Sequence, residues 1–348
     1  MDFLPLLTAR LAARRDLSPD EVEGAAARLA AIGVSEDAKA AFLTELAAKG
    51  ETASELAAFA RAFRARAVDP GVGAWAPRAI DIVGTGGDHS GGFNVSTLAT
   101  LVVACAGVPV MKHGNRGITS KCGSADLFSA IGVDLEAPPE KHRRALERLG
   151  YAYFFAPAWH PAFRQIGPVR KALAVRGQRT VFNILGPLLN PGRPAHVLLG
   201  AASPALAEKL AAALDELGTE AGLAVHGILA PGRGIDEITS ATVNVVRGAG
   251  RLRATNAEWR AEDFGLPTAP FEEIAGGDVA ANLALTQALA GGGGPRGLAD
   301  TIALNGAVAL WIVGARPDVR TGIAEARDLL LGGAVRKKIA DTRDFYGS

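Results

Sequence analysis

The first 67 residues carry apolar positions at helical spacing, and polar capping residues open each stretch. Ser18 forms a capping box with Glu21, and Thr52 forms a second box with Glu55. The pattern predicts helices that begin after Ser18, Ser35 and Thr52, the first two of which end at Gly33 and Gly50. One face of the last helix is expected to be core, formed by Leu56, Phe59, Ala60 and Phe63. The nearby basic residues are expected on a solvated face: Arg61, Arg64 and Arg66.

Residues 68–77 are rich in proline and glycine, which is typical of a linker. Beyond them, short β-prone runs alternate with apolar, alanine-rich helical stretches, which predicts βα units and a mostly parallel sheet. Strands are expected at 79–83, 108–111, 151–155, 197–199 and 223–225, and helices at 98–106, 125–131, 138–150, 204–217, 298–313 and 319–331. The expected fold class is α/β, with a small helical domain over 1–69 and a larger α/β domain over 70–348, whose central sheet is flanked by helices.

Composition narrows the classes of function. The 37 basic and 36 acidic residues nearly cancel, so no global field favours nucleic acid as a partner. The longest apolar run, 98–111, contains Gly107 and Pro109 and is too short to span a membrane. With only Cys105 and Cys122, and no signal peptide pattern at the N-terminus, the chain is expected in the reducing cytoplasm.

A glycine loop between an expected strand and an expected helix is the first candidate site. Gly84, Gly86 and Gly87 interrupt the apolar run, and Ser96 and Thr97 follow where a helix N-terminus presents free N–H groups. A tight βα turn with an ordinary cap explains the glycines alone. The loop also carries polar groups suited to a sugar phosphate and a metal ion, Asp88 and Asn94.

A second polar loop follows the next strand, where open α/β sheets place their ligands. Lys112, Asn115 and Arg116 are donors for phosphate oxygens, and Gly114 lets the backbone bend between them. Further hydroxyls come from Thr119, Ser120 and Ser124. His113 is a candidate general base or a structural hydrogen-bonding residue, and the sequence leaves both roles open.

An acidic pair, Asp236 and Glu237, follows another expected strand after a loop with glycine and proline. Mg²⁺ takes one or two carboxylates and completes its coordination with water and phosphate oxygens. The pair is therefore a candidate metal site, with a solvated surface turn as the alternative.

Taken in order, these motifs resemble the anthranilate phosphoribosyltransferase family over nearly the whole chain. The matching stretches are Gly84–Asp88, Asn94–Thr97, Lys112–Arg116, Gly123–Asp126, His160–Ala162 with Val169 and Arg170, Arg179–Leu188, and Asp236 with Glu237. So many ordered motifs are more specific than any one of them. The rival classes are a pyrimidine nucleoside phosphorylase and a nucleic-acid-binding relative without transferase activity.

The resemblance implies transfer of the phosphoribosyl group of phosphoribosyl pyrophosphate to the amine of anthranilate, in tryptophan biosynthesis, with Mg²⁺ as cofactor and no covalent nucleophile. The residues implied for phosphoribosyl pyrophosphate are Gly84, Gly87, Asp88, Gly92, Asn94, Val95, Ser96, Thr97, Lys112, His113, Gly114, Asn115, Arg116, Gly117, Ile118, Thr119, Ser120 and Ser124. Those implied for anthranilate are Gly84, Asn115 and Arg170, and those for the metal are Ser96, Asp236 and Glu237.

The resemblance also implies a homodimer formed through the helical domain, to which a middle segment near 163–183 returns. The sequence departs from the family pattern at Gly92, where the family often has threonine, and in two stretches that are longer, 174–178 and 229–233. None of these departures removes a motif residue.

Overall fold

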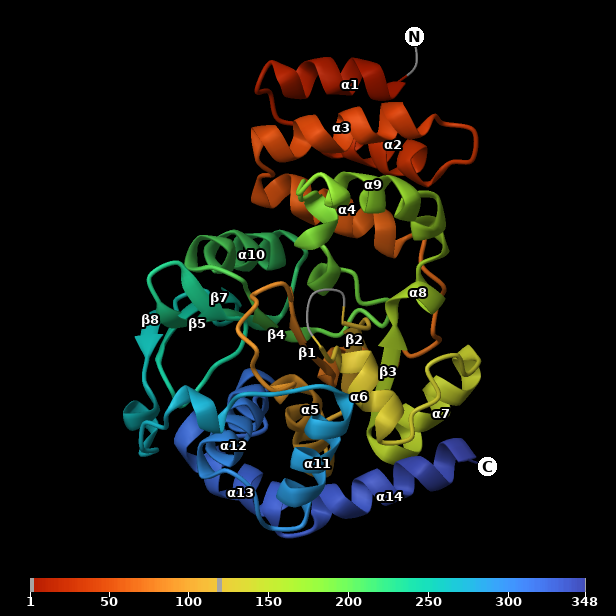
Figure 1. The fold of residues 1–348 in the computed structure, drawn as a ribbon. Helices are drawn as coiled ribbons and strands as arrows, with labels where there is room; N and C mark the ends of the chain where they lie inside the picture. The colour runs from red at the N-terminus through yellow and green to blue at the C-terminus, as the bar shows by residue number, and fades with distance from the viewer. Residues whose placement is uncertain (1–2, 118–120, 348) are drawn as a thin grey trace.

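The computed structural model describes residues 3–117 and 121–347. Three residues expected to bind phosphate, Ile118, Thr119 and Ser120, lie outside the described residues. The described chain has a helical domain at one end and a larger α/β domain built around one sheet (Figure 1). The fold class predicted from the sequence is therefore confirmed, and the residue boundaries of the two domains stay a prediction.

The helical domain is opened by α1 (Phe3–Ala12), α2 (Pro19–Ala30), α3 (Glu36–Lys49) and α4 (Ala53–Arg64). Both predicted capping boxes form: the Ser18 and Thr52 hydroxyls accept from the backbone N–H of Glu21 and Glu55 at 3.3 and 3.1 Å, and both glutamates reach back to the caps. Helix α2 ends before Gly33. Helix α1 was not predicted from the sequence.

A segment from the middle of the chain packs on this domain. It follows the short helix α8 (Ala156–Trp159) and contains η2 (Pro161–Gln165) and α9 (Gly167–Val175), which contact α2 and α3 respectively. Val169 and Leu173 of α9 belong to the same apolar core as α1–α4. The Phe63 ring of α4 lies 5.2 and 5.4 Å from the rings of Phe163 and Phe182, so an aromatic cluster joins the helical domain to the loops of the α/β domain.

The sequence predicts that Arg64, the last residue of α4, lies on a solvated face. In the structure its side chain is instead partly buried. Its Nε donates to the carbonyl of Leu188 at 2.7 Å, and burial lowers the pKa of its guanidinium to about 10. Arg64 is therefore a second link between the helical domain and the α/β domain.

Strand order places the first strand of the chain in the interior of the sheet. The described strands are β1 (Ile80–Gly84), β2 (Val110–Gly114), β3 (Tyr151–Phe155), β4 (His196–Gly200), β5 (Ala221–Ala230), β6 (Arg233–Ile235), β7 (Val243–Gly250) and β8 (Asn256–Trp259). Their order is β3-β2-β1-β4-β5-β7-β8, and β6 pairs with β5. Strands β1 to β5 are parallel, as predicted, whereas β6, β7 and β8 add antiparallel pairs that the sequence pattern did not predict.

Helices cover both faces of the sheet. The α/β domain contains α5 (Val95–Cys105), α6 (Ser124–Ala130), α7 (Pro139–Leu149), α10 (Pro204–Glu216), α11 (Val279–Ala290), α12 (Arg296–Ile312), α13 (Val319–Leu331) and α14 (Ala334–Gly347). Helix α5 begins at Val95, three residues before the predicted start at Leu98. Helices α11 and α14 were not predicted. The early start of α5 places Ser96 and Thr97 in its first turn.

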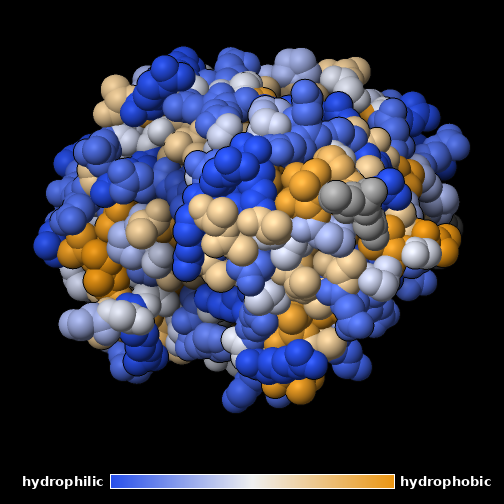
Figure 2. Space-filling view, turned by 90° about the horizontal axis from the view of Figure 1, so that it is seen from above, coloured by the Kyte–Doolittle hydropathy of each residue, from blue (hydrophilic) through white to orange (hydrophobic). Residues whose placement is uncertain are grey.

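Alternate residues of the central strands face two different cores. Ile80 and Ile82 of β1 pack with α5 and α12, whereas Val83 packs with α10 and the helical domain. Seen from the side of the helical domain, apolar residues form small groups among hydrophilic ones (Figure 2). In the described part of the chain, no helix combines the length and the apolar character needed to cross a membrane.

Helix α7 buries a histidine in an aromatic environment. His142 is 0% exposed, its ring lies 5.5 Å from that of Trp159, and neither ring nitrogen has a partner among the described residues. Burial lowers the pKa of His142 from 6.5 to about 4, against the opposing charge of Asp134. Between these two pH values the unfolded chain binds more protons than the folded chain at this site, so His142 lowers stability as the pH falls from about 7 to 4.

We expect His142→Phe to remove this dependence. We compare the unfolding free energy of the variant with that of the wild type at each pH. This difference should be about 2 kcal/mol more favourable to the variant at pH 5 than at pH 8. Denaturant unfolding of both proteins at the two pH values measures the effect. The comparison at pH 8 isolates any change in packing, because His142 is neutral there in both states. An equal difference at both pH values would show that His142 titrates normally in the folded chain.

Candidate functional site

The point where the sheet reverses its strand order defines the site. From β1 the chain runs outward to β2 and β3 and then returns to add β4 on the other side of β1. Open α/β sheets bind ligands at the carboxyl ends of the strands at such a point. Gly84 and Gly200 are paired there, as the last residues of β1 and β4, and the N–H of Thr85 donates to the Gly200 carbonyl at 2.9 Å.

Asp236 lies directly over these two glycines. A Cβ on Gly84 would stand 2.3 Å from Oδ2 of Asp236, and a Cβ on Gly200 would stand 1.6 Å from its carbonyl oxygen. The same Oδ2 accepts from the N–H of Gly86 at 2.7 Å. Glycine is therefore required at both strand ends, because any side chain would displace the acidic residue.

Glu237 joins the acidic pair to the start of α5. Its Oε1 accepts from the N–H of Ser96 at 3.2 Å, in the first helical turn, where backbone N–H groups have no partner within the helix. Val95 and Thr97 on either side are buried, and Oγ1 of Thr97 has no partner among the described residues. The structure thus brings together the three residues expected to hold a metal, Ser96, Asp236 and Glu237.

The charges of the acidic pair are strongly perturbed. Burial, and then the neighbouring Asp88 carboxylate, raise the pKa of Asp236 to about 7, and burial with Asp236 raises the pKa of Glu237 to about 8. Lys112 is 2% exposed and donates from Nζ to the carbonyl of Ile82. Burial lowers the pKa of its ammonium, and the charges of Asp81, Glu237 and Asp236 oppose that shift. In this structure Lys112 therefore serves as a buried counter-charge for the carboxylates.

Backbone conformation in the first loop requires glycine. Gly86 and Gly87 have φ values of +67° and +71°, in the left-handed region. Asp88 accepts from the N–H and the hydroxyl of Ser90 and from the N–H of Asp236, so it ties the loop to the acidic pair. A Cβ on Gly92 would lie 2.6 Å from Cδ1 of Ile235, so the threonine common at this position in the family would require that side chain to move.

Asn94 links the two predicted phosphate loops. It is the N-cap residue of α5, but its side chain makes no capping bond. Its Nδ2 donates to the carbonyl of Cys122 at 3.1 Å, and its Oδ1 accepts from Nδ2 of Asn282 at 2.9 Å. Asn282 lies on α11 and is 1% exposed. This asparagine was not predicted from the sequence, since it lies in an unpredicted helix and outside every quoted motif.

The second loop is held by its own polar groups. Arg116 pairs with Asp126 at 2.9 Å, and the other oxygen of that carboxylate accepts from the N–H of Gly117 at 3.0 Å. Those bonds lower the pKa of Asp126 despite its partial burial. Oδ1 of Asn115 accepts from the N–H of Arg116 at 2.8 Å. Only Nη1 of Arg116 is used in this pair, so the other guanidinium N–H groups can still donate to a phosphate.

Gly114 and Ser124 meet at a buried tyrosine. The Ser124 hydroxyl lies 2.9 Å from the hydroxyl of Tyr153, and a Cβ on Gly114 would stand 2.4 Å from the serine oxygen. Burial raises the pKa of Tyr153 far above its usual range. Gly114 is therefore needed for close packing at the end of β2.

His113 faces another histidine. Its Nε2 lies 3.2 Å from Nε2 of His160, and the two residues are 3% and 2% exposed. Burial, and then the charge of His160, lower the pKa of His113 well below 6.5, and burial lowers that of His160 to about 4. Both rings are therefore neutral at pH 7, and one donates to the other. These contacts favour the structural role of His113 over that of a general base.

Arg170 stands on α9, in the segment that packs on the helical domain. Its guanidinium lies 5.4 Å from the ring of Phe182 and donates to the Phe182 carbonyl at 3.4 Å. Within the described residues it makes no direct contact with the other residues expected to bind anthranilate, Gly84 and Asn115. The structure thus places Arg170 on a different element from the other two.

Arg179 is a further residue near the first loop. A Cβ on Gly87 would lie 3.7 Å from its Nη2. In the sequence Arg179 belongs to a matching motif, but no role was predicted for it. Once the tertiary structure is known, the position of this cationic side chain beside a glycine loop marks Arg179 as a candidate anion-binding residue.

A divalent cation fits the acidic pair. The donors are carboxylate and hydroxyl oxygens, which Mg²⁺ prefers, and a cation would relieve the repulsion that raises both pKa values. Among the described residues, no group of three or more His, Cys, Asp and Glu side chains is arranged to enclose a metal. Two carboxylates are sufficient for Mg²⁺ when phosphate oxygens supply further ligands.

Comparisons with known proteins agree with this architecture. Two sequence profiles match, "Glycosyl transferase family, a/b domain" over residues 76–336 and "Glycosyl transferase family, helical bundle domain" over residues 5–67. An anthranilate phosphoribosyltransferase of Synechococcus sp. (strain JA-3-3Ab) is 40% identical over 350 residues, covering 100% of this chain and 98% of the relative. The crystal structure of the Thermus thermophilus enzyme superposes with a TM-score of 0.87 at 38% identity, covering 100% of both chains.

A more distant structure comes from Saccharomyces cerevisiae, whose anthranilate phosphoribosyltransferase is in complex with PRPP (phosphoribosyl pyrophosphate) and Mg. It superposes with a TM-score of 0.83 at 25% identity, covering 99% of this chain and 98% of that one.

The helical bundle is joined to a mostly parallel sheet, and a glycine loop and a half-buried acidic pair meet at the switch point. The chain is thus of the two-domain type of glycosyl transferase whose profiles match. More narrowly, the chain belongs to the anthranilate phosphoribosyltransferase family, because relatives of that name match it over its whole length. The family predicted from the sequence motifs is confirmed. The roles of individual site residues stay predictions.

Proposed function

We propose that this chain transfers the phosphoribosyl group of phosphoribosyl pyrophosphate to the amine of anthranilate, a step of tryptophan biosynthesis. The products are N-(5-phosphoribosyl)anthranilate and pyrophosphate. The observation that carries the proposal is the acidic pair at the switch point, which contacts both the glycine loop through Gly86 and the start of α5 through Ser96. The related yeast structure with PRPP and Mg supports the same substrate and cofactor.

The reaction needs positioning and charge stabilisation rather than a covalent intermediate. The amine nitrogen of anthranilate forms a bond to the anomeric carbon of the ribose, the bond from that carbon to pyrophosphate breaks, and the nitrogen loses a proton. Negative charge grows on the leaving pyrophosphate, so fixed N–H donors and cations around it lower the barrier. The rest of the decrease in the reaction barrier comes from holding the two substrates in line.

The residues proposed to bind phosphoribosyl pyrophosphate come from both polar loops. The first loop and the start of α5 offer backbone N–H groups and the positive end of a helix dipole, and the second loop offers cationic and amide side chains. They are Gly84, Gly87, Asp88, Gly92, Asn94, Val95, Ser96, Thr97, Lys112, His113, Gly114, Asn115, Arg116, Gly117, Ile118, Thr119, Ser120 and Ser124.

Ser96, Asp236 and Glu237 are proposed to hold Mg²⁺, which when bound neutralises charge on the pyrophosphate oxygens. The chain prepares this site by holding the two carboxylates, half-buried and close together, against Gly84 and Ser96. Burial also keeps competing water away from the reacting groups.

One assay tests the reaction. Purified protein is mixed with Mg²⁺, phosphoribosyl pyrophosphate and anthranilate, and the loss of anthranilate fluorescence is followed. We expect loss only when all three are present, with release of pyrophosphate in equal amount. Consumption of a pyrimidine nucleoside with inorganic phosphate, in place of this reaction, would contradict the proposal.

Arg170 is proposed to bind the anthranilate carboxylate, together with Gly84 and Asn115. A planar guanidinium suits a carboxylate, and the contact with Phe182 orients it. We expect Arg170→Ala to lower kcat/KM for anthranilate about ten- to hundredfold, because a charge-assisted hydrogen bond is lost. The KM for phosphoribosyl pyrophosphate should change little, and Arg170→Lys should recover only part of the loss.

The matched control is Arg164→Ala, which removes an exposed arginine from the same segment. It should leave both substrates unaffected. If Arg170→Ala weakens the use of both substrates equally, or lowers the melting temperature enough to explain the loss, Arg170 supports the fold through Phe182 instead.

We also propose that the enzyme is a homodimer formed through its helical domain. The exposed large apolar residues support this assignment, because they lie on that domain, on α9 packed against it or in the linker: Leu6, Ile32, Val68 and Val175. Light scattering of the purified protein should give the mass of two chains, and the mass of one chain would contradict the assignment. We place the enzyme in the cytoplasm, where free anthranilate and reduced cysteines are expected.

A further inference from the structure

The backbone that follows the acidic pair is held by buried polar side chains of β7 and α12. Residues 238–240 come directly after Asp236 and Glu237. Asn244 of β7 and Thr301 and Asn305 of α12 contact this segment, and all three are 0% exposed. None of them belongs to the motifs that mark the site in the sequence.

Thr301 and Asn305 act on the segment from one face of α12. They are four residues apart, so they lie on the same side of the helix. Nδ2 of Asn305 donates to the carbonyl of Ile238 at 2.7 Å, and Oγ1 of Thr301 accepts from the N–H of Ser240 at 3.1 Å. The hydroxyls of Thr301 and Ser240 also lie 3.0 Å apart.

These polar groups stand in a largely apolar part of α12. Ile302, Leu304 and Val308 around them belong to the main core. Oδ1 of Asn305 is buried and has no partner among the described residues, which lowers stability. An apolar side chain would suit the core better, so packing alone does not explain an asparagine here.

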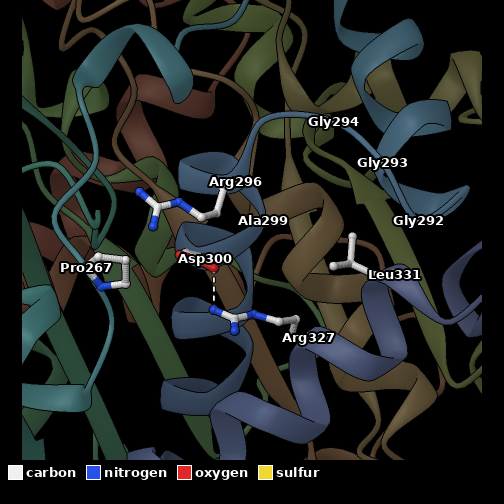
Figure 3. A pocket seen from close by; sticks show the side chains of 9 residues that line it. All are labelled: Pro267, Gly292, Gly293, Gly294, Arg296, Ala299, Asp300, Arg327 and Leu331. Atoms are coloured by element: carbon white, nitrogen blue, oxygen red, sulfur yellow. Dashed lines mark hydrogen bonds and ion pairs between the residues drawn. The ribbon is translucent and has the colours of Figure 1, made fainter.

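Helix α12 is itself anchored, so it can serve as a rigid support. On its other side, Asp300 pairs with Arg327 of α13, beside a pocket lined by residues 292–294, Arg296 and Leu331 (Figure 3). Asp300 is 2% exposed. The N–H of Gly297 donates to Glu273 at 2.6 Å, which holds the first turn.

We propose that Thr301 and Asn305 are positioning residues for the acidic pair. They fix the backbone of residues 238–240, and this keeps the Glu237 carboxylate at the start of α5 and the Asp236 carboxylate over Gly84. The inference rests on the proposed function of the pair. It predicts that removal of these hydrogen bonds weakens binding of a magnesium–phosphate ligand more than the accompanying loss of stability explains.

The test compares Thr301→Val, which keeps the shape and removes the hydroxyl, with Thr301→Ser, which keeps the hydroxyl. Asn305→Leu removes the amide at similar volume. Calorimetry with Mg²⁺ and inorganic pyrophosphate measures binding without turnover. We expect about tenfold weaker binding for Thr301→Val and Asn305→Leu, as for other residues that orient metal ligands, and near-normal binding for Thr301→Ser. The KM for phosphoribosyl pyrophosphate should rise in parallel.

Thr342→Val is the matched control. Thr342 is also 0% exposed, and its hydroxyl lies 2.8 Å from that of Tyr151, in a contact between α14 and β3. It should lower the melting temperature as much as Thr301→Val but leave pyrophosphate binding unchanged. If Thr301→Val and Asn305→Leu bind magnesium pyrophosphate as tightly as the wild type does, the inference is wrong and the proposed function is unaffected. Failure of the wild-type protein to bind magnesium pyrophosphate or to consume anthranilate would overturn the proposed function as well.

Discussion

Replacing the acidic pair by its amides, Asp236→Asn with Glu237→Gln, is expected to abolish most of the activity in a protein that still folds. Asparagine and glutamine keep carbonyl oxygens that can accept from the N–H groups of Gly86 and Ser96. They remove two carboxyl groups whose pKa values are raised, first by burial in both and then by Asp88 for Asp236 and by Asp236 for Glu237. The melting temperature should therefore not fall. Because neutral amides bind Mg²⁺ poorly, kcat/KM should fall at least about a hundredfold.

Steady-state kinetics over a range of Mg²⁺ concentrations checks this result, with Glu36→Gln plus Asp37→Asn as the control. That pair is also adjacent in the chain but exposed on α3, and its loss should leave kcat/KM unchanged. Near-normal turnover of the Asp236 and Glu237 variant, with the Mg²⁺ dependence of the wild type, would mean that the pair has no role with the metal.

The second large effect is expected from a single methyl group, in Gly200→Ala. The new Cβ would lie 1.6 Å from the carbonyl oxygen of Asp236, and backbone atoms cannot rotate away as a side chain would. The loop that carries the acidic pair must shift by an ångström or more. A displacement of about 1 Å at a reacting centre costs about a hundredfold in rate, so we expect kcat/KM to fall by that factor.

Overpacking at the end of β4 should also lower stability, by about 1–3 kcal/mol. Gly73→Ala is the control, because nothing lies within 4 Å of a Cβ there and the residue has no positive φ. It should match the wild type in activity and in melting temperature. If Gly200→Ala retains full kcat/KM, the position of Asp236 over the two strand ends is not required for the reaction.

Local chemistry was sufficient to predict much of the fold. The helices after Ser18, Ser35 and Thr52 form because a side chain beside each start satisfies N–H groups that the helix cannot. The parallel strands were predicted because buried β-prone runs alternate with helical stretches. The antiparallel strands β7 and β8 were missed, since their partly exposed residues and glycines lack a clear alternating pattern.

By itself the sequence determined the fold class, the family and the types of residue in the site, because each depends on motifs that are continuous in the chain. The tertiary structure alone decided which of those residues meet. Only the strand order sets Asp236 against both Gly84 and Gly200, about 150 and 36 residues away in the sequence. Only packing shows that Lys112 faces the carboxylates, that His113 pairs with His160, and that α12 holds the backbone behind the acidic pair. Such contacts depend on long-range topology, which no local pattern encodes.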